Sequence, residues 1–116
     1  MIAVFVTFRY GEDFSAPKLQ QLAESARARF EGMPGLRSKL FSVVPELREA
    51  RNVYVWDHPE CAQGFFTAEN LERIAALYGA RPILEYAQAC ALVDNSPRET
   101  ETRTRAAPAK RRSGRK

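Results

Sequence analysis

Strand and helix patterns follow one another along this chain in a fixed order, and that order restricts the fold more than any other feature. Residues 2–10 alternate apolar and other side chains with period two, which predicts a strand. A helix is expected between Ser15, a good N-cap residue, and Gly32, because apolar residues recur there at helical spacing. The N-terminal third therefore predicts a strand followed by a helix.

The remaining elements complete a repeating pattern. Strands are expected over 36–44, 51–56 and 82–93, and the last two are separated by helical segments. One helical segment starts at His58-Pro59, and the next is capped by Thr67 and ended by Gly79. The order strand-helix-strand-strand-helix-strand predicts an α+β, ferredoxin-like βαββαβ fold. In that fold a four-stranded antiparallel sheet carries both helices on one face.

The other face of such a sheet has no helical cover. If the strands contain no bulge, strict alternation assigns to the uncovered face Phe5, Thr7, Arg9, Lys39, Phe41, Tyr54, Trp56, Tyr86 and Gln88. The same alternation places under the helices Ile2, Val4, Val6, Phe8, Leu40, Val53 and Val55.

A monomer with this uncovered face in water would expose a large apolar patch. Each aromatic side chain brings roughly 150–250 Å² of surface. Five of them exceed the few hundred Å² that soluble monomers usually show. We therefore expect a homodimer in which two sheets face each other, a dimeric α/β barrel with a cavity inside.

Several short segments carry a resemblance to a known family. They are Gly35-Leu-Arg-Ser-Lys-Leu-Phe, Asn52-Val-Tyr-Val-Trp-Asp, Phe65-Phe66-Thr, Leu77-Tyr-Gly-Ala-Arg-Pro and Ala91-Leu-Val-Asp-Asn. Over residues 1–95 the chain resembles the YdhR-type monooxygenase-like proteins of the dimeric α/β-barrel superfamily, which includes the antibiotic-biosynthesis monooxygenases. The resemblance implies oxidation of a small aromatic or phenolic substrate by O₂ without a prosthetic group. A fold alone does not fix an activity, so whether the chain is an enzyme stays open.

Such chemistry needs an apolar cavity, a proton acceptor and a group that stabilises an anion. The substrate-binding candidates are Phe41, Tyr54, Trp56, Tyr86 and Lys39. Packing in a dimer core explains Tyr54 and Trp56 equally simply, because interfaces favour both residue types.

Two residues are catalytic candidates. His58 is the only imidazole of the chain and has the intrinsic pKa of a base, whereas Arg9 could stabilise an anion. Each has a simpler interpretation as well: His58 as a surface residue at a helix start, and Arg9 as the partner of Glu85 or Asp57 across the sheet.

The sequence contains no signature of a cofactor or metal site. It has no Gly-x-Gly-x-x-Gly run or phosphate-binding loop, and its single His and two isolated Cys predict no metal cluster. We therefore expect no cofactor.

Two alternatives to an enzyme remain. One is a non-enzymatic homodimer that binds a small ligand. The other, an RNA-binding module, is less favoured because residues 51–58 lack the glycine of that motif.

Charge divides the chain into two parts. Residues 1–96 hold ten Lys/Arg against twelve Asp/Glu, whereas residues 97–116 hold eight against two. The C-terminal part has no large apolar residue, so we predict a folded unit over 1–95 and a disordered basic tail over 96–116. The tail is a solubilising segment or a weak contact for nucleic acid and other anions.

The expected compartment follows from cysteine usage and hydropathy. Cys61 and Cys90 are predicted to be buried, reduced thiols, one in a helix and one in a strand. The start of the chain resembles a strand rather than a signal peptide, and no stretch has membrane-spanning length. We expect a cytoplasmic protein that does not contact a membrane.

Overall fold

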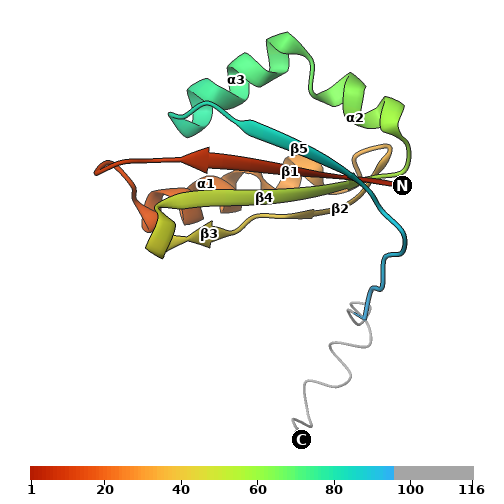
Figure 1. Ribbon diagram of the computed structural model, residues 1–116, viewed down its shortest axis with the longest axis horizontal. Helices are drawn as coiled ribbons and strands as arrows, with labels where there is room; N and C mark the ends of the chain where they lie inside the picture. The colour runs from red at the N-terminus through yellow and green to blue at the C-terminus, as the bar shows by residue number, and fades with distance from the viewer. Residues whose placement is uncertain (96–116) are drawn as a thin grey trace, which may run out of the picture.

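The structure is a computed structural model that describes residues 1–95; the predicted basic tail lies outside the described residues. The strands form one antiparallel sheet in the order β2-β4-β1-β5, with β3 paired to β4 as well. Figure 1 shows α1 along the β4 side of the sheet and the α2–α3 arm along the β5 side. The elements are β1 (Ile2–Arg9), α1 (Ala16–Phe30), β2 (Leu36–Leu40), β3 (Val43–Val44), the 3-10 helix η1 (Pro45–Leu47), β4 (Glu49–Trp56), α2 (Pro59–Phe65), α3 (Ala68–Tyr78) and β5 (Ile83–Gln88). The predicted ferredoxin-like α+β fold is confirmed.

The predicted helix ends are confirmed by their caps. The Ser15 hydroxyl accepts a hydrogen bond from the Lys18 amide at 3.3 Å, and the Thr67 hydroxyl accepts one from the Asn70 amide at 3.2 Å. Gly79 ends α3 in the left-handed region with φ 70°. Each cap satisfies a backbone group that the helix itself leaves unpaired.

Two strand boundaries differ from the prediction. The strand expected over 36–44 is interrupted after Leu40 and continues as β3 in an unchanged register with β4, since Leu40 stands opposite Val53 and Val43 opposite Ala50. The last strand ends at Gln88 instead of Val93. After the strand, the Ala89 N–H donates to the carbonyl of Met1 at 3.1 Å.

The early end of β5 also changes the predicted environment of the Cys90 thiol. Cys90 was expected in a buried strand, but it follows β5 and is exposed. Cys61 lies in α2 and is half-buried, so only this thiol packs against the core.

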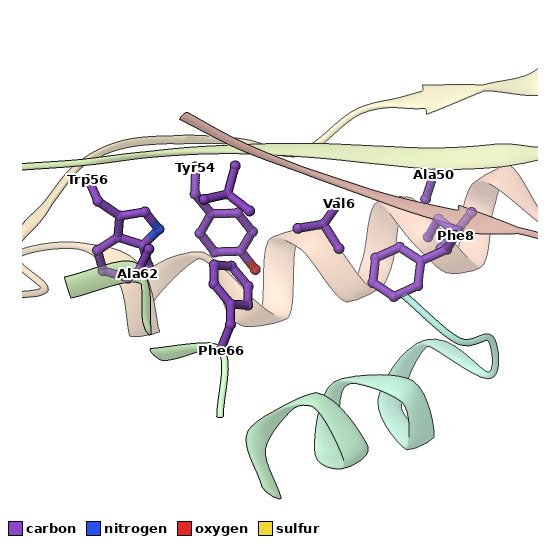
Figure 2. Close-up of a cluster of buried hydrophobic side chains, with 9 residues drawn as sticks. Val6, Phe8, Ala50, Tyr54, Trp56, Ala62 and Phe66 are labelled. Carbon is purple, nitrogen blue, oxygen red and sulfur yellow. The ribbon is translucent and has the colours of Figure 1, made fainter. Parts of the chain in front are cut away.

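The side-chain phase of β4 is opposite to the predicted one. Tyr54 and Trp56 are 4% and 2% exposed and point toward the helices, on the same side as Val6 and Phe8 (Figure 2). The register explains this, because Val4 stands opposite Tyr54 and directly opposed residues share a face. The prediction that these aromatics lie on the uncovered face is therefore wrong.

The phase of β2 and β5 was mispredicted too. Lys39 stands opposite Tyr54, and Tyr86 stands opposite Val4, so both lie on the helical side of the sheet. Phe41, just after β2, also faces the helices, since its ring lies 5.9 Å from that of Phe30. The placement of Gln88 on the uncovered face is wrong for the same reason as that of Tyr86, because it stands opposite Ile2.

The uncovered face is apolar at its centre and charged at one end. Its apolar side chains alternate along their strands with the side chains that face the helices. They are Phe5, Leu40, Val53, Val55 and Ile83. The predicted helical cover of Leu40, Val53 and Val55 is therefore wrong. At the charged end, Glu49 accepts from Arg9 at 3.2 Å and from Arg51 at 2.8 Å.

Candidate ligand-binding site

A cavity of about 440 Å³ lies between the β2–β4 half of the sheet and the helices. Its volume is within the range of roughly 300–1,000 Å³ that is usual for small-molecule sites. The lining is mostly apolar and comes from α1, β2, β4, the end of α2 and α3. The side chains that line it are Ala26, Arg29, Phe30, Lys39, Phe41, Tyr54, Phe65, Asn70, Arg73, Ile74, Ala76, Leu77 and Tyr78.

An aromatic cluster forms the inner wall of this cavity. Phe30 at the end of α1 meets Tyr54 of β4 at 6.0 Å and Phe65 of α2 at 6.0 Å, measured between ring centroids. Phe66, outside the lining, packs edge-on against Tyr54 at 5.0 Å. These separations are within the favourable range of aromatic pairs. The wall is thus built from the end of α1 and from β4 and α2, which follow much later in the sequence.

Lys39 extends from β2 into this aromatic wall. Its ammonium nitrogen lies 3.7 Å from the ring centroid of Phe30, 3.9 Å from that of Tyr54 and 4.1 Å from that of Phe41. Each of these distances is well inside the cation–π limit of about 6 Å. Within residues 1–95, no carboxylate lines the cavity with it. The lysine amine is therefore surrounded by ring faces rather than by a counter-ion.

Two effects act on the ionisation of Lys39 in opposite directions. Ring faces favour the ammonium, by about 0.5–1 kcal/mol for an exposed cation–π contact and more where it is desolvated. Loss of hydration disfavours it and lowers the pKa of Lys39 from 10.5 to about 7. Desolvation is the larger effect, so the pKa of this amine stays below that of an ordinary lysine.

Tyrosine hydroxyls complete the polar part of the lining. Burial raises the pKa of Tyr54 and of Tyr78, so both remain protonated donors at neutral pH. The Asn52 side-chain amide donates to the Tyr78 hydroxyl at 3.0 Å, and the Tyr78 ring stacks on Phe8 at 3.9 Å. Asn52 is only 2% exposed, and its hydrogen bond from β4 holds the Tyr78 hydroxyl on the sheet side of the cavity.

The structure brings together only part of the predicted site. Phe41, Tyr54 and Lys39 line the cavity, although they reach it from the helical side of the sheet. Trp56 stacks on Tyr54 at 6.0 Å but is not part of the lining. Tyr86 lies beside Met1 and Pro59, where it borders a different hollow.

The two predicted catalytic residues lie away from the cavity. His58 is exposed at the N-cap position of α2 and makes no side-chain capping bond. Arg9 is on the uncovered face of the sheet, where it pairs with Glu49 rather than with Glu85 or Asp57. Asp57 pairs instead with Arg37, at 2.7 Å.

Four polar lining or supporting residues were missed by the sequence reasoning. Asn52 carries a detectable signal, because it is the one amide at an inward-facing position of a strand that is otherwise apolar. Asn70, whose amide donates to the Phe65 carbonyl at 2.7 Å, has no comparable signal. Arg29 and Arg73 look like ordinary surface residues of helices until α1 and α3 are placed side by side.

The described residues contain neither a metal-binding group nor a membrane-spanning helix. Among residues 1–95, no three His, Cys, Asp or Glu side chains group as a metal site would require. None of the helices in that range is long and apolar enough to cross a membrane.

Comparisons with known proteins identify the fold. No protein-family model and no curated protein matches the sequence. Among solved structures, NE2512, a protein of unknown function from Nitrosomonas europaea, superposes with a TM-score of 0.63 at 13% identity, covering 83% of this chain and 95% of its own. A proposed antibiotic biosynthesis monooxygenase from Deinococcus radiodurans gives 0.56 at 15% identity, with coverage of 84% and 100%.

A third structure was solved with a ligand. It is the monooxygenase from the gene ActVA-Orf6 of Streptomyces coelicolor, in complex with nanaomycin D. It superposes with a TM-score of 0.59 at 17% identity and covers 82% of this chain and 92% of its own. At such low identities the likeness shows a shared fold, that of the antibiotic-biosynthesis monooxygenases, over nearly the whole length of these proteins.

Proposed function

We propose that this protein binds a small, flat aromatic substrate in the cavity above β2 and β4 and oxidises it with O₂ as a cofactor-independent monooxygenase. The observation that carries the proposal is the aromatic wall around Lys39 inside a cavity of about 440 Å³. The shared fold of a monooxygenase solved with nanaomycin D supports it. Membership of the YdhR-type branch is part of the same proposal.

The reaction proposed for such a substrate can be balanced without an added reductant. An anthrone, for example, loses a proton from its CH₂ carbon, and the resulting carbanion combines with O₂ to give a peroxide. Loss of the second C–H proton and cleavage of the O–O bond leave a ketone and water. One oxygen atom enters the product, and all electrons come from the substrate. The cavity contributes by holding the planar anion away from water.

Lys39 is the group best placed to accept the first proton. An amine with a pKa lowered to about 7 is partly neutral at physiological pH, and it becomes an ammonium beside the substrate anion that it creates. Protonated Tyr54 and Tyr78 line the same cavity and can donate hydrogen bonds to that anion. His58 and Arg9, the catalytic candidates from the sequence, have no part in this proposal because they lie outside the cavity.

Oxygen uptake tests the enzymatic proposal. Purified full-length protein is mixed with a panel of anthrones and hydroquinones in an oxygen electrode, with no cofactor added. We expect uptake above the buffer rate that rises with pH through about 7, the pKa of Lys39. Lys39→Met should abolish this rise, whereas Lys18→Met, an exposed lysine of α1, should leave it unchanged. Wild-type uptake no faster than that of Lys39→Met across the panel would reject the proposal.

A non-enzymatic ligand-binding protein is the second candidate. The observation that favours it is the absence of Arg9 and His58 from the cavity lining among the described residues, which leaves Lys39 as the sole proton acceptor. Calorimetric titration with the same panel separates the two functions. Tight binding without oxygen uptake would favour the binding protein.

A homodimer remains part of the proposal, now for a different reason. Phe5, Leu40 and Ile83 are 40%, 58% and 40% exposed on the uncovered face, so a mostly aliphatic surface that keeps one aromatic, Phe5, replaces the expected aromatic one. Two copies joined sheet to sheet would cover it and form the dimeric α/β barrel. The solution mass of the full chain should be twice that of one chain, and Leu40→Lys should reduce it to the monomer mass. A wild-type monomer would reject the barrel.

The remaining sequence predictions enter the proposal unchanged. The folded unit ends near residue 95, the basic residues after it form a separate tail that is a solubilising segment or a weak contact for nucleic acid and other anions, and the protein acts in the cytoplasm. RNA binding measured at two salt concentrations, with and without residues 97–116, tests the role of the tail.

A further inference from the structure

Two arginines from different helices border the cavity, and neither has a counter-ion. Arg29 of α1 and Arg73 of α3 line the cavity, and both side chains are largely in solvent, unlike Lys39 deeper inside. Within residues 1–95 neither arginine forms an ion pair. Glu69 precedes Arg73 by one turn of α3, yet the two do not pair.

The contrast with a neighbouring arginine is informative. Arg27 lies on the same helix as Arg29, outside the lining, and pairs with Glu31 at 3.4 Å. The C-cap residue of α1 thus supplies a carboxylate to the arginine outside the cavity lining, whereas the arginine at the cavity edge has no carboxylate partner among the described residues. No Asp or Glu is found among the described residues that line the cavity. Its charged groups are therefore all cations.

We propose that Arg29 and Arg73 form an anion-binding rim and that the natural ligand is a planar aromatic acid. Its ring system would lie against Phe30, Tyr54 and Phe65, with its carboxylate at the rim. Guanidinium groups suit this role because they bind carboxylates through two parallel hydrogen bonds and stay charged at any physiological pH. This inference rests on the proposed function, since it names the substrate class of the same cavity.

The position of the rim also gives the ligand an orientation. Lys39 and Tyr54 lie on the sheet, and the hydroxyl of Tyr78 reaches Asn52 of β4 from α3, whereas Arg29 and Arg73 lie on the two helices. A carboxylate held between the helices leaves the opposite edge of the ring system next to the lysine amine. The acid group would then select and orient the substrate, and the reacting edge would be a different one.

A matched pair of ligands tests the inference. The probes are 2-naphthoate and its neutral, nearly isosteric analogue 2-naphthamide, titrated calorimetrically into the full-length protein at pH 8. We expect the acid to bind roughly tenfold more tightly than the amide, a preference that falls with added salt. The double variant Arg29→Gln/Arg73→Gln should lose this preference while its affinity for the amide stays within about twofold.

Arg27→Gln is the matched control. It removes a cation from the same helix but not from the cavity, so the acid preference should persist. The basic tail is identical in all variants and cannot account for a difference between them. Equal binding of acid and amide to the wild type, or a preference that survives in the double variant, would overturn the inference. Neither result would contradict the proposal that the cavity binds an aromatic ligand. Failure of both probes to bind would count against the inference and the proposed function together.

Discussion

Lys39 of β2 stands directly opposite Tyr54 of β4, and its ammonium lies 3.9 Å from the centroid of the tyrosine ring. Directly opposed residues of an antiparallel pair share a face of the sheet. One register position therefore places a cationic side chain among aromatics beneath the helices. A lysine in that place lowers stability, so it is expected at a functional site rather than in an ordinary core.

Replacing Lys39 by methionine should stabilise the protein. The unfolded chain has the ordinary lysine pKa of 10.5 and the folded protein one of about 7, so between these values the unfolded chain binds more protons. The free energy of unfolding of the wild type therefore rises with pH across this window, and the full cost of the buried charge is present below pH 7.

Lys39→Met removes that cost. We expect a gain of roughly 2 kcal/mol at pH 6, because cation–π attraction offsets part of the desolvation. The gain should be smaller at pH 9, where the wild-type amine is mostly neutral. Urea unfolding at both pH values measures it, with the exposed Lys18→Met as control. An equal gain at both pH values would show that Lys39 does not titrate in this range.

The order of the elements could be predicted because it depends on local signals. The period-two alternation over residues 2–10 and the helix caps at Ser15 and Thr67 depend only on residues that are close in the sequence. The structure confirms both. Burial then follows from how the elements meet. That step requires contacts between residues far apart in the chain, which a single sequence does not encode in its periodicity.

Strand phase could not be predicted for a physical reason. In the run Val53, Tyr54, Val55 and Trp56, every residue favours a strand and tolerates burial, so alternation does not tell one face from the other. The register with β1 decides it. The face of Lys39 was mispredicted for a related reason. A charged residue on a strand usually faces water, whereas the ammonium of Lys39 faces three aromatic rings.

Trp56 should tolerate phenylalanine far better than alanine. Its side chain is 2% exposed, and within residues 1–95 its indole N–H has no hydrogen-bond partner. Trp56→Phe loses volume but also removes an unpaired buried donor, so a cost below about 1.5 kcal/mol is expected. Trp56→Ala opens a cavity and should cost roughly 3–5 kcal/mol. Chemical denaturation measures both. Equal costs would indicate that the indole N–H is paired in the native protein.

Glu49 should be the most important carboxylate of the uncovered face. Its side chain is 10% exposed and accepts from the guanidinium groups of Arg9 and Arg51. Glu49→Gln removes the charge and turns an amide donor toward one of these cations. We expect a loss of about 1–2 kcal/mol, moderated because both arginines are half-exposed or more.

The matched control for this carboxylate is Glu31→Gln, which breaks the exposed pair with Arg27 and should change the unfolding free energy by less than about 0.5 kcal/mol. Urea unfolding of both variants gives the comparison. If the two substitutions cost the same, the buried position of Glu49 adds nothing to its ion pairs.

Gly35 connects the turn before β2 to α2 and should not tolerate a side chain. Its φ is +81°, and a Cβ atom built there would lie 2.7 Å from the sulfur of Cys61. Gly35→Ala therefore combines a strained backbone with a steric overlap, and we expect a loss of roughly 2–4 kcal/mol. The Gly35 carbonyl also accepts the Asp57 amide at 2.8 Å, so a shift of this turn would disturb the end of β4.

A double-mutant cycle isolates the contribution of the sulfur. Cys61→Ala removes the sulfur, so Gly35→Ala should cost less in that background than in the wild type, and the remainder measures the backbone strain together with the 3.1 Å approach to the Cβ atom that alanine keeps. Gly64→Ala is the control: it lies in α2 with open space around it, and there alanine should be neutral or stabilising by up to about 1 kcal/mol. An undiminished cost of Gly35→Ala beside Cys61→Ala would show that overlap with the Cys61 sulfur contributes nothing to the loss.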